Sequence, residues 1–416
     1  MAMMRARQDT PDLILFLFIL FLLWTKNKSI KFLSLCLKMS SFASKYLSED
    51  EYTILKNIFQ EPKFSYSKLA KEVNLSPPTV KKKLNSLMKK GFIKGFHAEY
   101  YPEALGLESH IFLLRVESRD KLQVLERVLQ FQPYLVQQSR CYGAINGIML
   151  KVHIPANSVN NIFTFLEYLK IHDLIKEIVH SYYIGNGIKT RLNLECWDPK
   201  TNEFTNFNWD LWEKNIDSVD YVPAFFSLQK IIREKAKNIL PRMHYEDFQI
   251  LKELLEDTNK KNADIAKELD IPEYTLSRRI KFLQENVIRN YLVKFDPQFY
   301  GLQDDLIFKV ICGTRALTKI VYLLQNLSLP FDSDFRQTDD GFLWKILLPP
   351  SEKMRLINLL WSMFPALQIM VIDPQSYITK SFDPSNFSFR TLSWKDSYEF
   401  MVEEVLKKAR EELLIV

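Results

Sequence analysis

The chain carries one sequence pattern twice, and this repeat constrains the fold more than any other feature. The segment EYTILKNIFQEPKFSYSKLAKEVNLSPPTVKKKLNSLMKKGFI, residues 51–93, matches DFQILKELLEDTNKKNADIAKELDIPEYTLSRRIKFLQENVI, residues 247–288. The segment WDPKTNEFTNFNW (197–209) is echoed in the same way by FDPSNFSFRTLSW (382–394). A long fixed period indicates repeated structural units, so we expect two versions of one unit of roughly 180 to 195 residues, joined near Lys235–Arg242.

Each unit is predicted to begin with three helices. Asn74 follows the second helix of the first copy, and Asp270 stands at the matching position of the second copy. Both residue types tolerate left-handed backbone, so each is expected in a tight turn. Ser76 can cap the third helix. The segment KKGFIKGFHAEYY then predicts a glycine-bounded strand pair, and the whole pattern is typical of a winged helix-turn-helix.

The third helix of the first copy has a polar face that suits a nucleic acid. Val80, Leu84 and Leu87 cluster on one side at about 100° per residue, which leaves the opposite side basic. The segment 65–97 holds eight Lys and one Glu, a net charge of +7 in a chain whose total is +6. This clustering favours DNA over a merely solvated lysine surface. The residues predicted to contact DNA here, with one from the wing, are Pro78, Thr79, Lys81, Lys82, Asn85, Ser86, Lys89 and Lys94.

The second copy is less basic. Its segment 261–294 holds seven basic and five acidic residues, and Glu285 stands where Lys89 stands in the first copy. We hypothesise that the first copy supplies most of the phosphate attraction and that the second reads bases through Arg278. Alternatively, the second copy is a degenerate domain retained for packing. The DNA-contacting residues predicted here are Tyr274, Arg278, Lys281 and Arg289.

The remainder of each unit alternates between strands and helices in the order βαββαβ, which predicts an antiparallel sheet with helices on one face. The fold class is therefore α+β, with two tandem units, each a winged helix-turn-helix followed by a ferredoxin-like domain. Tryptophans 197, 209 and 212 are expected in the core. The predicted boundaries are an apolar N-terminal segment (1–44), winged helix-turn-helix 1 (45–104), sheet domain 1 (105–190), a Trp-containing arm and linker (191–240), winged helix-turn-helix 2 (241–299), sheet domain 2 (300–380) and a C-terminal arm and helix (381–416).

A winged helix-turn-helix followed by such a sheet domain resembles the Lrp/AsnC (feast/famine) transcription regulators, on the segments SKLAKEVNLSPPTVKKKLNSLMKKGFIKG and EALGL. The resemblance implies self-association through the sheet domains and a small effector such as an amino acid. The family's effector loop has a Gly and, three residues later, an Asp. In the first unit the loop is GAIN, which keeps the Gly as Gly143 but has Asn146 in place of the Asp. In the second unit it is QTDD, which keeps the Asp as Asp340 but has Gln337 in place of the Gly. These loops are candidates for an effector site, or they are purely structural.

The resulting expectation is a sequence-specific DNA-binding transcription regulator with two modules in one chain, acting as a built-in pseudo-dimer on double-stranded DNA. No catalytic residue, cofactor or metal is predicted, so the chain is expected not to be an enzyme. One alternative is an enzyme, since siroheme decarboxylases resemble the same architecture; His153, His180 and Arg140 are then candidates for a tetrapyrrole pocket. Another alternative is a scaffold that only pairs with other proteins.

The four cysteines are dispersed and form no metal-binding pair, which favours reduced thiols in a cytoplasmic protein. Near the N-terminus, Leu13–Trp24 is apolar throughout but too short to span a bilayer comfortably. A start site placed too early, with the native chain beginning at Met39, and a short membrane anchor both remain open. Membrane association is not expected unless residues 13–24 are a real anchor.

Overall fold

The computed structural model describes residues 47–413 except 206, 217, 234–235 and 328. The predictions for Leu13–Trp24 and Met39 lie outside these residues. Within the described part of the chain, no helix is both long and apolar enough to cross a membrane.

The first three helices form as the sequence predicts. They are α3 (Glu49–Gln60), α4 (Tyr66–Glu72) and α5 (Pro77–Lys90), followed by strand β1 (Ile93–Tyr100). Asn74 adopts left-handed backbone with φ 54°, and the Ser76 side chain accepts the N–H of Thr79 at the start of α5. Gly91 ends α5 with φ 87°, a conformation that favours glycine. The turn and cap predictions are therefore confirmed.

A second group of helices has the same order of elements. It contains α10 (Tyr245–Glu256), α11 (Asn262–Leu269), α12 (Glu273–Asn286) and strand β8 (Ile288–Phe295). Asp270 takes the left-handed position with φ 52°, as predicted. A buried salt bridge joins α12 to α10. The carboxylate of Asp247 on α10 is fully buried and accepts hydrogen bonds from the guanidinium of Arg279 on α12.

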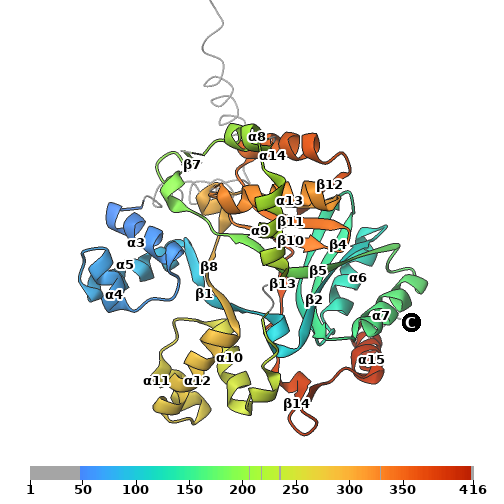
Figure 1. The fold of residues 1–416 in the computed structure, drawn as a ribbon. Helices are drawn as coiled ribbons and strands as arrows, with labels where there is room; N and C mark the ends of the chain where they lie inside the picture. Colours follow the sequence, from blue (N-terminus) through green and yellow to red (C-terminus); the bar gives the residue numbers. More distant parts are fainter. Residues whose placement is uncertain (1–46, 206, 217, 234–235, 328, 414–416) are drawn as a thin grey trace, which may run out of the picture. The chain divides into compact units, whose positions relative to one another are not determined.

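The wing strands differ from the prediction. Instead of a strand pair inside each copy, β1 pairs antiparallel with β8, so that His97 lies opposite Leu292 (Figure 1). A single strand next to each helix group leaves unpaired N–H and C=O groups, and pairing the two strands satisfies both. The two helix groups are thus attached to one two-stranded ribbon.

Eight further strands form a closed barrel. The first set is β2 (Leu107–Arg115), α6 (Arg119–Leu129), β3 (Leu135–Gly143), β4 (Gly147–Pro155), α7 (Val159–Ile171) and β5 (Glu177–Thr190). The second set is β9 (Asp304–Ile311), α13 (Thr314–Asn326), β10 (Ser333–Thr338), β11 (Gly341–Leu348), α14 (Pro350–Met363) and β12 (Leu367–Ile372).

Barrel closure corrects the expectation of two separate ferredoxin-like sheets. The strand order is β12-β9-β11-β10-β5-β2-β4-β3, and β12 pairs again with β3. The edge strands of one set therefore pair with those of the other, β5 with β10 and β3 with β12. Open edges of two small sheets are removed by this closure, which is the physical reason for the difference.

The side chains of β4 point alternately into two different hydrophobic cores. Ile148, Leu150 and Val152 belong to the large core beneath α6 and α7, whereas Met149 belongs to a small apolar cluster together with Ile307 and Leu343. Because successive side chains of a strand point to opposite faces, Lys151 and His153 lie on the same inner face as Met149. This places two polar side chains at the barrel interior.

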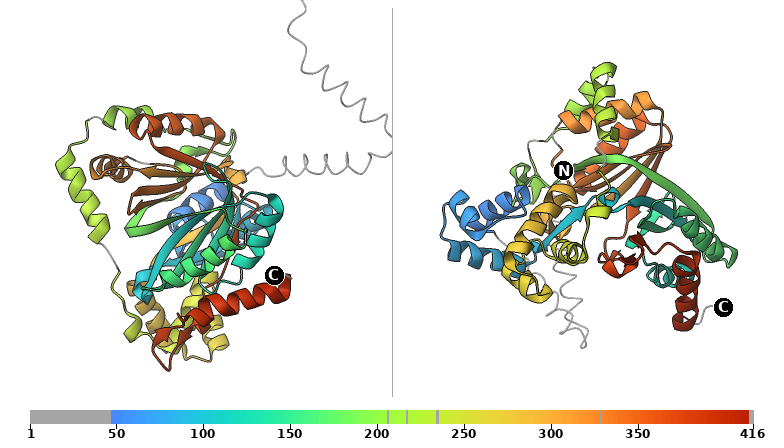
Figure 2. Two further views of the ribbon diagram at one scale, coloured as in Figure 1. Left: turned by 90° about the vertical axis from the view of Figure 1, so that its right-hand side faces the viewer. Right: turned by 60° about the horizontal axis from the view of Figure 1, so that its bottom comes forward.

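The segment that follows each set of barrel strands, called an arm here, packs on a helix of the other set. The first arm contains β6 (Trp197–Asp198), β7 (Glu203–Phe204), α8 (Asp210–Ile216) and α9 (Tyr221–Arg233), and α8 and α9 contact α13. The second arm contains β13 (Ile378–Thr379), β14 (Phe387–Ser388), β15 (Ser393–Trp394) and α15 (Glu404–Leu413), and α15 contacts α6 (Figures 1 and 2). Tryptophans 197, 209 and 212 are all buried, which confirms their placement in the core.

Candidate functional sites

The outer face of α5 is a surface of free cations. Lys81, Lys82, Asn85 and Lys89 are exposed, and within the described chain the three lysines make no ion pair. The other lysines of this helix are engaged. Lys83 pairs with Asp50 at 2.9 Å. Lys90 pairs at 2.8 Å with Glu51.

Four more residues predicted to contact DNA lie at or near this face. Pro78 is exposed, and Thr79 is partly buried with its hydroxyl 2.8 Å from that of Ser76. Lys94 is exposed and pairs with Asp296 at 3.1 Å. Ser86 is different, because its hydroxyl donates to Glu51 Oε1 at 2.9 Å. We therefore correct the prediction for Ser86, whose side chain holds α5 against α3.

On α12, the predicted outward residues are also exposed. Tyr274 is 80% exposed, and Arg278 and Lys281 lie beside it on the surface. Lys281 approaches Glu285 at 3.9 Å, so part of its charge is compensated. Arg289 does not belong to this face. It lines an internal cavity and donates to the backbone carbonyl of Asn186, which corrects its assignment to DNA contact.

The two predicted effector loops are closed by internal contacts. The N–H of Gly143 donates to Asn146 Oδ1 at 3.0 Å, and a Cβ on Gly143 would lie 2.5 Å from the carbonyl oxygen of Ile369. In the second loop, the Asp340 carboxylate accepts a hydrogen bond of 2.8 Å from the ammonium of Lys309, which is almost fully buried. These contacts support the structural interpretation of both loops.

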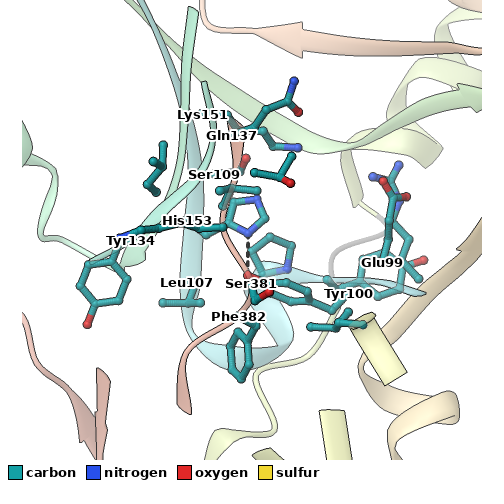
Figure 3. A pocket seen from close by; sticks show the side chains of 18 of the residues that line it. Glu99, Tyr100, Leu107, Ser109, Tyr134, Gln137, Lys151, His153, Ser381 and Phe382 are labelled. Carbon is teal, nitrogen blue, oxygen red and sulfur yellow. Dashed lines mark hydrogen bonds between the residues drawn. The ribbon is translucent and has the colours of Figure 1, made fainter. Parts of the chain in front are cut away.

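A cavity of about 340 Å³ lies between the β1–β8 ribbon and one end of the barrel (Figure 3). Its walls come from β1, β8, β2, β3, β4, β5 and β10, and from the start of the second arm near Phe382. A volume of this order suits a small-molecule ligand. No single sequence segment indicates the cavity, because its lining comes from widely separated parts of the chain.

A tyrosine and a histidine meet in this cavity. The hydroxyl of Tyr100 lies 2.7 Å from Nδ1 of His153, and a dashed line marks this contact in Figure 3. Burial, and to a lesser extent Lys151, hold the pKa of His153 well below its ordinary value, so the ring is neutral at pH 7. Burial, with a smaller effect of Glu103, raises the pKa of Tyr100. The pair therefore holds a phenol proton next to a neutral imidazole.

The inner end of the cavity holds more positive than negative charge. The side-chain ammonium of Lys151 makes no hydrogen bond or ion pair within the described chain, and burial lowers its pKa to about 8 against the opposing effect of Asp334. Arg336 is paired with Asp334 through two hydrogen bonds of 2.6 and 3.2 Å. Burial alone would raise the pKa of Glu99, but Lys189 at 2.5 Å lowers it to about 2. Lys151 is left without a carboxylate of its own.

A bulge in β5 supplies the only oxygen that Arg289 contacts within the described residues. Ile184 and Ile188 pair with Gln337 and Phe335, so three residues of β5 lie opposite one residue of β10. The middle one, Asn186, is flanked by glycines with φ 69° and 66°. Its backbone carbonyl oxygen accepts hydrogen bonds from the guanidinium groups of both Arg289 and Arg336. One carbonyl shared by two guanidinium groups compensates neither charge.

Of the three residues considered for a tetrapyrrole pocket, the structure brings only His153 to the cavity. Arg140 is engaged with Glu126 through hydrogen bonds of 2.6 and 2.7 Å. His180 lies 2.9 Å from His110 and stacks on it. Sequence reasoning missed Tyr100, Lys151 and Arg289 as cavity residues, because their proximity depends on barrel closure and on the ribbon.

Comparisons with known proteins give a domain and an architecture. Residues 51–94 match the family model of winged helix-turn-helix DNA-binding domains. No curated protein matches the sequence. A crystal structure of the siroheme decarboxylase NirDL is similar over 86% of this chain and 99% of its own, with a TM-score of 0.51 and 12% identity. An AsnC family transcriptional regulator from Agrobacterium tumefaciens aligns with 36% of this chain and 98% of its own, with a TM-score of 0.31 and 19% identity.

These comparisons overturn one expectation. The chain was expected not to be an enzyme, but a protein whose fold matches it over 86% of its length is a siroheme decarboxylase. The chain contains a winged helix-turn-helix DNA-binding domain at residues 51–94, set within an architecture that an enzyme also uses.

Proposed function

We propose that the chain is a DNA-binding transcription regulator of the Lrp/AsnC type that contacts double-stranded DNA through the outer face of α5. The observation that supports this most is the set of exposed lysines 81, 82 and 89, which have no ion pair within the described chain although Lys83 and Lys90 of the same helix do. Cations left free on a recognition helix are available to phosphates. The match of residues 51–94 to winged helix-turn-helix DNA-binding domains supports the same function.

The ribbon supports a two-helix mode of binding. Since β1 and β8 pair directly, α5 and α12 are held on one rigid element, as two half-site readers of a pseudo-dimer would be. In this proposal the two halves are versions of one unit, α5 supplies the phosphate contacts and α12 contributes Tyr274 and Arg278. The domain boundaries, self-association through the sheet strands and a cytoplasmic location remain part of the proposal.

The test is a salt titration of DNA binding by the full chain. A duplex is first selected from a random pool, and its affinity is then measured by fluorescence anisotropy at several salt concentrations. Replacing Lys81, Lys82 and Lys89 together by Ala should weaken binding and flatten the salt slope by up to about 2.7, or about 0.9 for each phosphate that the variant no longer neutralises. The control replaces three exposed lysines on other elements, Lys200, Lys214 and Lys407.

Two outcomes would contradict this proposal. The first is that no duplex is enriched at any salt concentration. The second is that the control triple variant loses as much affinity as the α5 variant, because the attraction would then come from overall charge rather than from α5.

The cavity favours a second function, an enzyme that acts on a carboxylate-bearing tetrapyrrole as siroheme decarboxylase does. Lys151 and Arg289, which lack carboxylate partners within the described chain, suit the acidic side chains of such a substrate. Decarboxylation breaks a carbon–carbon bond, releases CO2 and leaves an electron pair on carbon that must take a proton. Tyr100, held by His153, is the candidate proton donor. The DNA face and the cavity are different surfaces, so the two functions are compatible.

Absorbance and mass spectrometry separate this function from the first. Iron-uroporphyrin III, added to the purified chain, should give a shifted Soret band, and siroheme should lose mass in units of CO2. Arg289→Gln should weaken both signals, whereas Arg315→Gln, at an exposed position on α13, should not. A Soret band identical with and without protein would sink the enzyme proposal and leave the DNA proposal untouched.

A further inference from the structure

The cavity and the DNA-binding elements share one structural part, the β1–β8 ribbon. His97, Ala98, Glu99 and Tyr100 on β1 all line the cavity, and so do Arg289 and Lys294 on β8. The same two strands follow α5 and α12 directly in the chain. A molecule in the cavity therefore touches the element to which both recognition helices are attached.

The charge at the inner end indicates what kind of molecule this is. Three cations line it there, Lys151, Arg289 and Arg336, against one carboxylate, Glu99. Glu99 is paired with Lys189 and Arg336 with Asp334, two residues outside the lining, so these pairs cancel and leave Lys151 and Arg289 in excess. At the rim, Lys294 and Lys380 are accompanied by three carboxylates, Glu103, Glu256 and Asp383, so the excess of positive charge lies deep in the cavity.

The two cations in excess are poorly compensated by the protein. Lys151 has no polar partner within the described chain, and Arg289 shares one backbone carbonyl with Arg336. Enclosed charges without a counter-charge cost free energy, and a bound anion would recover it. Because Lys151 is on β4 and Arg289 is on β8, an anion that contacts both connects the barrel to the ribbon.

We propose that the cavity binds a small multivalent anion, held by Lys151 and Arg289, and that its binding changes the affinity of the chain for DNA through the ribbon. The second clause rests on the proposed DNA-binding function; the first does not. Carboxylate and phosphate groups share the required chemistry, since both accept charge-assisted hydrogen bonds from lysine and arginine. The effector site of this chain is then the cavity rather than the closed loops at Gly143 and Asp340.

The first measurement is ligand binding without DNA. Citrate and, separately, orthophosphate are titrated into the full chain by isothermal calorimetry. Lys151→Met and Arg289→Gln should each weaken binding by at least about tenfold, as expected for the loss of one charge-assisted hydrogen bond. Arg289→Lys should retain part of the affinity because it keeps the charge. The matched controls, Lys407→Met and Arg315→Gln, change exposed residues remote from the cavity and should bind as the wild type does.

The second measurement is coupling to DNA. The affinity for the selected duplex is compared with and without saturating citrate or phosphate, at an ionic strength matched with chloride. A change of about fivefold or more is expected in the wild type and none in Lys151→Met. Hydrogen exchange of the β1 and β8 peptides should slow when the anion binds, which reports on the ribbon even without DNA.

The outcomes distinguish the parts of the proposal. If neither anion binds the wild type, or if the control variants lose as much affinity as Lys151→Met, the site is overturned. If an anion binds but neither DNA affinity nor ribbon exchange changes, the coupling is overturned. If the chain binds an anion and protects the ribbon but binds no DNA, the site is upheld and the proposed function fails.

Discussion

Gly187 is the residue on which the bulge in β5 depends. Its φ is +66°, and a Cβ at this position would lie 2.4 Å from the carbonyl oxygen of Phe335. We predict that Gly187→Ser lowers the free energy of unfolding by about 2 kcal/mol or more, because left-handed backbone alone costs a side chain about 1–2 kcal/mol. Urea unfolding measures this difference.

The same substitution at Gly313 is the control. A Cβ on Gly313 meets no atom within 4 Å, and the residue is the N-cap of α13, a position that serine favours. Gly313→Ser should therefore leave the unfolding free energy unchanged or raise it slightly. An unfolding free energy of Gly187→Ser equal to that of the wild type would mean that the bulge tolerates a side chain and that Asn186 is not fixed by its neighbours.

His110 makes the stability of the barrel depend on pH. It is almost fully buried, and its Nδ1 lies 2.9 Å from Nε2 of His180. Burial, and then His180, lower the pKa of His110 to about 4. An unfolded histidine has a pKa of about 6.5, so the unfolded state binds more protons between these values. The contribution of His110 is complete above pH 6.5 and is lost as the pH falls from 6.5 towards 4.

Acidification should therefore destabilise the wild type. Going from pH 7.5 to pH 5 should remove up to about 2 kcal/mol through His110, at about 1.4 kcal/mol per pH unit below 6.5. His110→Phe, which keeps an aromatic ring but does not titrate, should show a smaller fall of the unfolding free energy over this range. The control is His172→Phe at an exposed position, and its pH dependence should follow that of the wild type. Parallel curves for all three proteins would exclude His110 as the cause.

Helix α8 shows how an arm is held at the scale of an element. Trp212 is 1% exposed and stacks on Trp344 of β11, with ring centroids 6.3 Å apart and planes at 11°. Its neighbour Leu211 is 55% exposed. We predict that Trp212→Ala costs about 3–5 kcal/mol of unfolding free energy, whereas Leu211→Ala costs less than about 0.5 kcal/mol. Denaturant unfolding of both variants is the measurement, and a similar cost for both would mean that α8 is not anchored through its tryptophan.

Local elements were predictable from the sequence because their causes are local. Asn74 and Ser76 fix the turn and the start of α5 through their own backbone and side-chain preferences. The outward position of Lys82 follows from helix periodicity. Arg289 was misplaced because helix-turn-helix patterns do not reveal what a wing strand pairs with. The meeting of Lys151 with Tyr100 could not be predicted, since it depends on barrel closure between segments that share no local signal.

At the scale of the whole molecule, the two halves are interlocked by exchanged arms. Trp197 of the first arm packs against Tyr300 of the second half, with ring centroids 5.1 Å apart. In the second arm, Trp394 packs on Phe248 and donates its indole N–H to the carbonyl of Leu105 in the first half, at 2.7 Å.

This interlocking predicts that neither half is stable as a monomer. Residues 45–237 alone would expose the edges of β1, β5 and β3, which pair in the full chain with β8, β10 and β12. Unpaired edges and an uncovered apolar face favour self-association, so this fragment should elute from size-exclusion chromatography as a dimer or as aggregates. Co-expression with residues 238–416 should restore a one-to-one complex with the mass of residues 45–416, measured by light scattering. A monomeric 45–237 fragment with a cooperative thermal transition would show that barrel closure is not what completes the fold, and the two halves would then be independent domains on a tether.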